Sequence, residues 1–155
     1  MPLAITAYQW YLAIHILAVV IWVGSGFGLL VLIVRMRAED DARSMAALLR
    51  GAEFMGPRIF GGSGLVALVF GLILVSKGDW PWDFWVIFGL VGWAAAFAHG
   101  AGVLGVKAGK LIPALDSEGW SDRVKADFSS YVTHMRLDAL LLVFVVLDMA
   151  LKPGA

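Results

Sequence analysis

Four long apolar blocks occupy most of this chain, and they predict a protein that crosses a membrane several times. The blocks are Tyr11–Val34, Ile59–Ser76, Phe84–Val106 and Tyr131–Leu151. A span needs about 20 apolar residues to cross roughly 30 Å of hydrocarbon. The first and third blocks reach that length without a Lys, Arg, Asp or Glu. We therefore expect one all-α domain over residues 1–155, an integral membrane four-helix transmembrane bundle. The expected spans are about 9–34, 58–76, 84–107 and 129–151.

The composition agrees with a bilayer environment and excludes several other classes. Hydrophobic residues make up 61% of the chain and charged residues 15%, whereas soluble domains are roughly half apolar and a quarter charged. With no cysteine, disulfides, iron–sulfur clusters and thiolate ligands are excluded. The net charge is zero and no basic tract occurs, so no nucleic-acid partner is expected. The first apolar run lacks a basic leader and is too long for a cleavable signal peptide.

The positive charges predict the orientation. The first and third connections between the blocks hold nine Lys or Arg residues: Arg35, Arg37, Arg43, Arg50, Arg58, Lys107, Lys110, Arg123 and Lys125. The other connection and the tail hold only Lys77 and Lys152. Because cytoplasmic connections are enriched in Lys and Arg, we expect both termini outside a bacterial cytoplasmic membrane. Aromatic residues then form an outer interfacial belt: Trp10, Tyr11, Trp80, Trp82 and Trp85.

The two basic connections contain helix-forming and helix-breaking residues. Residues 39–54 are expected to form a short amphipathic helix lying at the headgroup boundary. Gly56 and Pro57 are expected to break it before the second span. In the second basic connection, Pro113 and Gly119 are expected to interrupt regular structure.

Glycines are frequent, and two pairs have the GxxxG spacing: Gly24 with Gly28, and Gly105 with Gly109. Small residues let helices approach closely in lipid, which would suit a homodimer formed through the glycine faces. Missing side chains would also make room for a flat ligand such as a porphyrin. The two interpretations are compatible.

Three histidines, His15, His99 and His134, lie within the apolar blocks. An imidazole in hydrocarbon needs a hydrogen-bond partner, a cavity or a metal, so all three are candidate metal ligands. At 1.5 Å per residue, His99 and His134 differ in depth by roughly 3 Å, while His15 lies on the order of 15 Å from either. One iron could therefore be shared by His99 and His134, but not easily by His15 and either of them.

Three further polar residues complete the candidate site. Asp138 follows His134 by four residues and shares its helix face, so it can orient an imidazole ligand or simply pin the helix to its neighbours. Asp148 lies at a depth similar to that of His15 and is its expected partner. Arg136 can pair with the propionates of a ligand or extend to the headgroups.

Several short motifs resemble one family of membrane proteins. The segment Trp10-Tyr-Leu-Ala-Ile-His15 with the later Trp22-Val-Gly24 resembles the first span of the HemJ-type protoporphyrinogen oxidases and of the related CopD-like proteins. Phe54-Met-Gly-Pro57, Ala98-His99-Gly100 and the closing Lys152-Pro153 also match that group. In overall spacing the chain looks closer still to an uncharacterised family of four-span bacterial proteins within this superfamily.

The resemblance implies a b-type haem, with His15 as the best carried-over ligand and His99 as the second matching histidine. HemJ-type proteins carry a lysine early in the third span, where this chain has Phe84-Trp-Val-Ile-Phe-Gly-Leu-Val91. That departure counts against porphyrinogen oxidation. The depth estimate favours His99 and His134 as ligands, whereas the resemblance favours His15. Two haems, or a single five-coordinate haem on His15, would reconcile the two lines of reasoning.

Three functions follow as hypotheses. The first is a haem-binding membrane protein that handles electrons for a quinone, a porphyrin or a respiratory partner. The second is a HemJ-type protoporphyrinogen oxidase. The third is a cofactor-free accessory subunit whose histidines only form hydrogen bonds. A copper or proton pathway is a fourth, less supported hypothesis.

Overall fold

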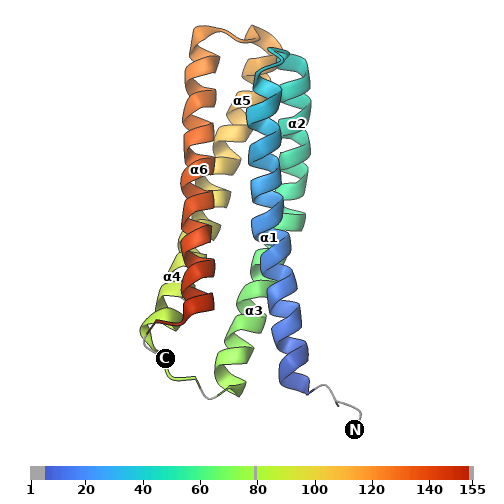
Figure 1. The fold of residues 1–155 in the computed structure, drawn as a ribbon. Coiled ribbons are helices and arrows are strands. Elements are labelled where there is room, and N and C mark those ends of the chain that lie inside the picture. The colour runs from blue at the N-terminus through green and yellow to red at the C-terminus, as the bar shows by residue number, and fades with distance from the viewer. Residues whose placement is uncertain (1–5, 79, 154–155) are drawn as a thin grey trace.

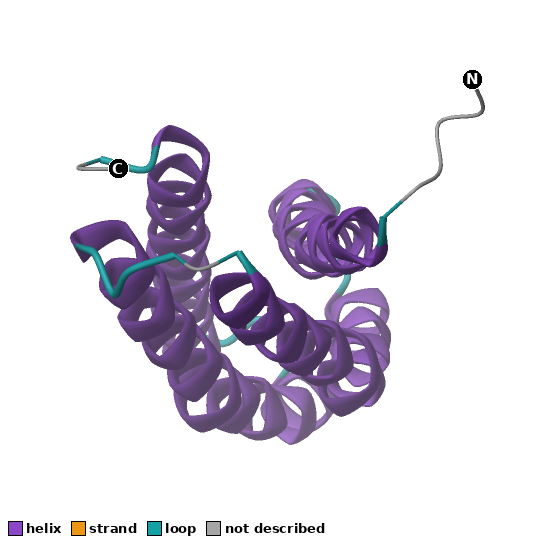
Figure 2. Cartoon of the chain, turned by 90° about the horizontal axis from the view of Figure 1, so that it is seen from below, coloured by secondary structure: helices purple, strands orange, loops and turns teal. Residues whose placement is uncertain are grey.

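Four long helical rods stand side by side in the computed structural model, which describes residues 6–78 and 80–153 (Figure 1). Two rods are single helices, α1 (Ala7–Arg37) and α6 (Asp122–Leu151). The other two each consist of two α-helices joined by a π-helical turn. They are α2 (Ala42–Met55), η1 (Gly56–Gly61) and α3 (Gly62–Lys77), and α4 (Phe84–His99), η2 (Gly100–Leu104) and α5 (Gly105–Glu118). Figure 2 shows only helices and loops in the described part of the chain.

Three stretches among the described residues are long and apolar enough to cross a membrane: Ala7–Arg37, Ala42–Lys77 and Phe84–Glu118. The fourth rod, α6, is not one of them, because Arg136, Asp138 and Asp148 interrupt its apolar sequence. The all-helical prediction is therefore confirmed, and at least three of the four expected spans have the required length and hydropathy.

The rods begin and end where the sequence satisfies free backbone groups. Thr6 and Gln9 form a reciprocal capping box at the start of α1. The Ser121 side chain accepts a hydrogen bond from the Val124 N–H at the start of α6. Gly119 adopts a φ of 59° just after α5, a conformation that side chains with a Cβ disfavour.

The predicted break at Gly56 and Pro57 is wrong, because the helix passes through this point as the π turn η1. Proline has no N–H and its ring clashes with the carbonyl four residues earlier, and a wider turn accommodates both effects. Likewise, Pro113 lies inside α5, which continues to Glu118. The interruptions expected at Gly56, Pro57 and Pro113 are therefore absorbed within continuous rods, whereas the one expected at Gly119 is confirmed, because α5 ends there.

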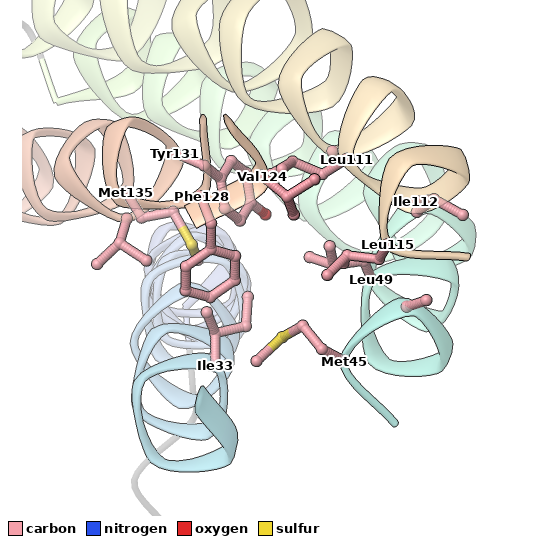
Figure 3. Close-up of a cluster of buried hydrophobic side chains, with 13 residues drawn as sticks. Ile33, Met45, Leu49, Leu111, Ile112, Leu115, Val124, Phe128, Tyr131 and Met135 are labelled. Atoms are coloured by element: carbon pink, nitrogen blue, oxygen red, sulfur yellow. The ribbon is translucent and has the colours of Figure 1, made fainter. Parts of the chain in front are cut away.

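The half of the molecule containing α2, α5 and the adjoining ends of α1 and α6, here called the upper tier, has a conventional hydrophobic core. Thirteen buried residues from these four helices form one cluster, which includes Ile33, Met45, Leu49, Leu115 and Phe128 (Figure 3). The prediction that residues 39–54 lie flat at the headgroup boundary is wrong, because α2 stands upright and packs against α5. Its apolar face covers a protein core instead of lipid.

The remaining half, the lower tier, consists of α3, α4 and the other ends of α1 and α6, and is built differently. Here α1 pairs with α3, and α4 pairs with α6. The buried residues are mostly small, such as Ala18, Ala67, Gly89 and Gly92, while large side chains such as Phe144 face outward. Small contacts and an apolar exterior are the pattern expected for helices packed in lipid.

Candidate functional site

A three-residue hydrogen-bonded network joins α4 to α6. Nδ1 of His99, the last residue of α4, lies 2.9 Å from Oδ1 of Asp138, and its Nε2 lies 3.1 Å from Nδ1 of His134. Both partners are on α6, one turn apart. His99 and Asp138 are largely buried, with side chains 23% and 17% exposed. Within the lower tier and its boundary, this network is the largest group of hydrogen-bonded ionisable side chains among the described residues.

The sequence predicted part of this arrangement. The similar depths of His99 and His134 are confirmed by their direct contact. Asp138 does share a helix face with His134, but the imidazole that it orients belongs to His99. Helical residues four apart lie side by side, and a residue from the opposite helix fits between them, so both contact His99 instead of one another.

The chemistry of the partners limits the proton positions in this network. Ionised Asp138 only accepts hydrogen bonds, so His99 donates through Nδ1–H. The Nε2 of a neutral His99 is then an acceptor, and His134 donates to it through Nδ1–H. This leaves a lone pair on Nε2 of His134. That nitrogen has no partner among the described residues and is not a buried atom.

A second imidazole lies between α1 and α3. Nδ1 of His15 is 2.8 Å from the carbonyl oxygen of Ala67. A carbonyl can only accept, so His15 carries its proton on Nδ1 and its lone pair on Nε2. Gly71 makes room for the ring, because a Cβ at that position would lie 3.1 Å from Cε1 of His15.

The predicted pairing of His15 with Asp148 is wrong, since His15 bonds to Ala67 on the neighbouring helix. Asp148 is only 8% exposed, and its Oδ2 has no hydrogen-bond partner within residues 6–78 and 80–153. Depth along a rod does not define the direction in which a side chain points, and these two residues lie on helices that each have a closer neighbour. Arg136 is exposed on α6, as either of its expected roles requires.

Two of the five aromatic residues expected in the interfacial belt, Trp80 and Trp85, meet beside the connection between α3 and α4. The Trp80 and Trp85 rings meet edge to face at 5.5 Å, and Nζ of Lys152 lies 4.1 Å and 5.3 Å from their centroids. Trp80 also donates to the Tyr8 hydroxyl at 3.3 Å. These contacts tie the ends of α1, α4 and α6 together at one level.

The residues around His15 fit one axial position of a haem. A histidine that ligates through Nε2 commonly donates its other N–H to a carbonyl, as His15 does. Helices α1 and α3 and the η1 turn form an apolar groove of about 330 Å³, which His15 does not line; its lining residues are Ile14, Leu17, Ala18, Ile21, Arg58, Ile59, Ser63 and Val66. Its one cation, Arg58, is the kind of group that binds a carboxylate such as a propionate.

The pair formed by His99 and His134 does not fit the shared iron in this arrangement. Each metal–nitrogen bond is about 2.0 Å long, so two ligands on opposite sides of one iron lie about 4 Å apart. Here the two nitrogens are 3.1 Å apart and bonded to one another. Ligation by both rings would require this hydrogen bond to open. Among the described residues, no three or more His, Cys, Asp or Glu side chains are arranged so that they could hold one metal ion.

The fold and the apolar lower tier define the chain as an integral membrane protein. A family model described as "Predicted integral membrane protein (DUF2269)" matches residues 10–153, and the chain belongs to that family. The description specifies the membrane location and no reaction. No curated protein and no solved structure matches the chain.

Two structural features were not predicted from the sequence. One is the upper-tier core; the apolar face of α2 was assigned to the headgroup boundary, and the residues of α5 were treated as a connection. The other is the pair of π turns. Each is bounded by glycines with four residues between them, Gly56 with Gly61 and Gly100 with Gly105. Such turns often accompany functional sites, and η2 follows His99 directly.

Proposed function

We propose that this protein is a haem-binding integral membrane protein with an electron-transfer or redox role. The observation that carries the proposal is His15, whose Nδ1–H is engaged by the Ala67 carbonyl and whose Nε2 then carries a lone pair that can bind a metal. The proposed cofactor is haem b, which would supply one-electron chemistry to the site.

In this proposal the chain provides the ligand, its orientation and the surroundings of the cofactor. His15 would hold the iron, and Ala67 would fix the ring. The low-dielectric groove and Arg58 would adjust the reduction potential through burial and charge. His99 and His134 are assigned no ligand role, because they are bonded to one another.

We further propose that all four rods cross a bacterial cytoplasmic membrane, with both termini outside. The nine Lys and Arg residues of the two basic connections support this orientation, because those connections lie together at the upper end (Figure 1). The apolar part of α6, which contains Arg136, Asp138 and Asp148, would be shielded by α4 and α1. A Cβ added at Gly24 or Gly28 would meet no other helix within 4 Å among the described residues, and these glycines would lie on the face used for a homodimer.

The electron partner would be a quinone, a porphyrin or a respiratory protein. A cofactor-free accessory role is the main alternative. One observation favours it, which is that each of the three imidazoles already has a hydrogen-bond partner in the protein. A HemJ-type oxidase would additionally rescue a strain that lacks its own protoporphyrinogen oxidase.

An absorbance spectrum of the detergent-purified protein, oxidised and then reduced with dithionite, tests the proposal together with a pyridine haemochrome assay. We expect a Soret band and a haem content of one per chain. The substitution His15→Ala should remove the band, whereas His134→Ala, which also deletes an imidazole from the bilayer region, should retain it.

A preparation that stays colourless after haem supplementation during expression would refute haem binding and favour the accessory role. Loss of the band in His134→Ala but not in His15→Ala would refute the choice of ligand while leaving haem binding intact. The two outcomes therefore separate the cofactor from its assigned ligand.

A further inference from the structure

The hydrogen-bonded chain His134–His99–Asp138 has two states that are equally well satisfied. In the first, His134 donates to His99, and His99 donates to ionised Asp138. In the second, protonated Asp138 donates to Nδ1 of His99, and His99 donates through Nε2 to Nδ1 of His134. Every nitrogen and oxygen within the chain keeps its partner in both states. Such a chain can reverse its polarity without moving a heavy atom.

We propose that this chain is a proton relay that carries protons from the upper tier into the hydrocarbon. A proton from water binds Nε2 of His134, and the Nδ1 proton of His134 passes to Nε2 of His99. The Nδ1 proton of His99 then passes to the Asp138 carboxylate. The net result is one proton gained by Asp138, with both rings converted to the Nε2–H form. Release runs the same three transfers in reverse: Asp138 returns its proton to Nδ1 of His99, the Nε2 proton of His99 passes to Nδ1 of His134, and the Nε2 proton of His134 leaves to water.

Neither end atom of the relay is hydrogen-bonded to another side chain in the described part of the protein. Nε2 of His134 and Oδ2 of Asp138 have no hydrogen-bond partner among the described residues, yet neither is a buried atom. His134 and Asp138 are four residues apart on α6, so the relay moves a proton about 6 Å along the rod. The direction runs from the upper tier towards the lower tier.

The depth of the network suits this role. Asp138 lies 13 residues from the lower end of α6, or about 20 Å, and His134 lies 17 residues from it, or about 26 Å. With the lower tier in roughly 30 Å of hydrocarbon, His134 is near the upper boundary. Lys107 donates to Ser130 one turn above His134, at 2.9 Å, so polar groups continue from the boundary to water.

Few other charges act on the relay. Arg136 is exposed on α6 and forms no ion pair with Asp138, and Lys107 on α5 is engaged by Ser130. Between Ala7 and Val34, α1 has no Lys, Arg, Asp or Glu, and α3 has none before Lys77. Proton transfer within the network should therefore depend on its own three members. Below Asp138, Val145 of α6 packs closely against Gly92 of α4. The relay can therefore exchange protons with water only on its upper side.

Nitrogen NMR of histidine-labelled protein in nanodiscs tests the relay without reference to haem. The chain has only three histidines, so single substitutions assign every ring. Near neutral pH we expect His99 and His134 both in the Nδ1–H form, with a scalar coupling across their N–H···N bond. On acidification both rings should change together, as coupled groups do, while His15 changes separately.

The substitution Asp138→Asn keeps an oxygen that can accept from His99 but cannot take up a proton. It should abolish the joint change, whereas Asp148→Asn, a second buried carboxylate on α6 with no histidine partner, should leave it intact. If Asp138→Asn does not fold, His134→Phe removes only the entry point. It should slow exchange of the His99 Nδ1 proton by about 100-fold, the low end for a positioned acid–base group.

Independent titration of His99 and His134 would overturn the proposal, as would unchanged exchange at His99 in His134→Phe. A colourless protein with coupled histidines would refute the haem proposal alone. A haem-containing protein with independent histidines would refute the relay alone.

Discussion

Phe128 and Phe144 lie on the same helix, and comparing them tests the division into two tiers. Phe128 is 0% exposed in the upper tier, where its ring meets Trp120 edge to face at 5.1 Å and Arg37 lies 5.3 Å from its centroid. Phe144 is 59% exposed in the lower tier. If the upper tier stands in water and the lower tier in lipid, the same truncation has different costs at the two positions.

The Phe128→Ala substitution should lower the free energy of unfolding by about 3–5 kcal/mol, the range for removing a buried phenylalanine. That is a factor of more than about 100 in the unfolding equilibrium constant. Phe144→Ala should change it by less than about 1 kcal/mol, because this ring contacts lipid whether or not the rods are packed. Alanine also has the higher helix propensity, which offsets part of any loss.

The measurement is equilibrium unfolding in mixed micelles with increasing SDS, followed by tryptophan fluorescence and circular dichroism. Trp120, in contact with Phe128, reports on the upper tier directly. Equal losses for the two variants would refute the two-tier interpretation. A loss below about 1 kcal/mol for Phe128→Ala would show that the upper-tier core contributes little.

Two further predictions concern the close α4–α6 contact and the start of α2. A Cβ at Gly92 would lie 2.3 Å from Cγ2 of Val145, a stiff β-branched side chain, whereas at Gly89 it would meet the end of a flexible methionine. Gly92→Ala should therefore destabilise the protein by about 1–3 kcal/mol and Gly89→Ala by less, as measured by the same unfolding assay; the reverse order would contradict this packing. The hydrogen bond from Ser44 lowers the pKa of Asp41, the residue that caps α2, below its ordinary value of 3.8. Because the folded pKa is the lower one, the cap stabilises the protein above pH 3.8, and this contribution disappears as the pH falls through the folded pKa. As the pH falls from 3.8 through the folded pKa of Asp41, the melting temperature should decrease less in Asp41→Ala than in the unmodified protein. An identical decrease in the two proteins would disprove the contribution of the cap.

The helical rods were predictable from the sequence because hydropathy is a local property. The blocks beginning at Tyr11 and Phe84 fall within α1 and α4–α5, and the depth estimate placed His99 beside His134 correctly. Depth follows from residue number at a fixed rise per residue, so it needs no knowledge of the neighbouring helix.

Side-chain direction was not predictable in the same way. His15 and Asp148 lie at similar depths, yet His15 bonds to the Ala67 carbonyl. The partner of a residue depends on which helices are adjacent and how each is rotated, and one apolar block gives no information about rotation because its faces are all hydrophobic. For the same reason, the sequence did not show that His99 reaches both His134 and Asp138.

The upper tier was missed because an amphipathic helix has the same pattern on a membrane surface as in a protein core. The apolar face of α2, with Met45 and Leu49, suits either. The deciding feature is a second amphipathic helix of matching length, α5, with Leu111 and Leu115 buried on its own face. Two such helices at the same end of a bundle can cover each other, and neither needs the headgroups.

The two π turns occur where the tiers meet, and this position explains the location of the polar network. The η1 turn ends 16 residues before the lower end of α3, and η2 begins 16 residues after the start of α4, so both lie about 24 Å from the lower end. At that height the contacts between helices change: small residues meet in the lower tier, and large side chains form the core of the upper tier. A wider turn rotates the following residues around the helix axis and so permits this change. His99 immediately precedes η2, and Asp138 and His134 lie opposite it on a helix without such a turn. A polar network at this height is deep enough to be shielded by the lower tier and close enough to water to exchange protons with it.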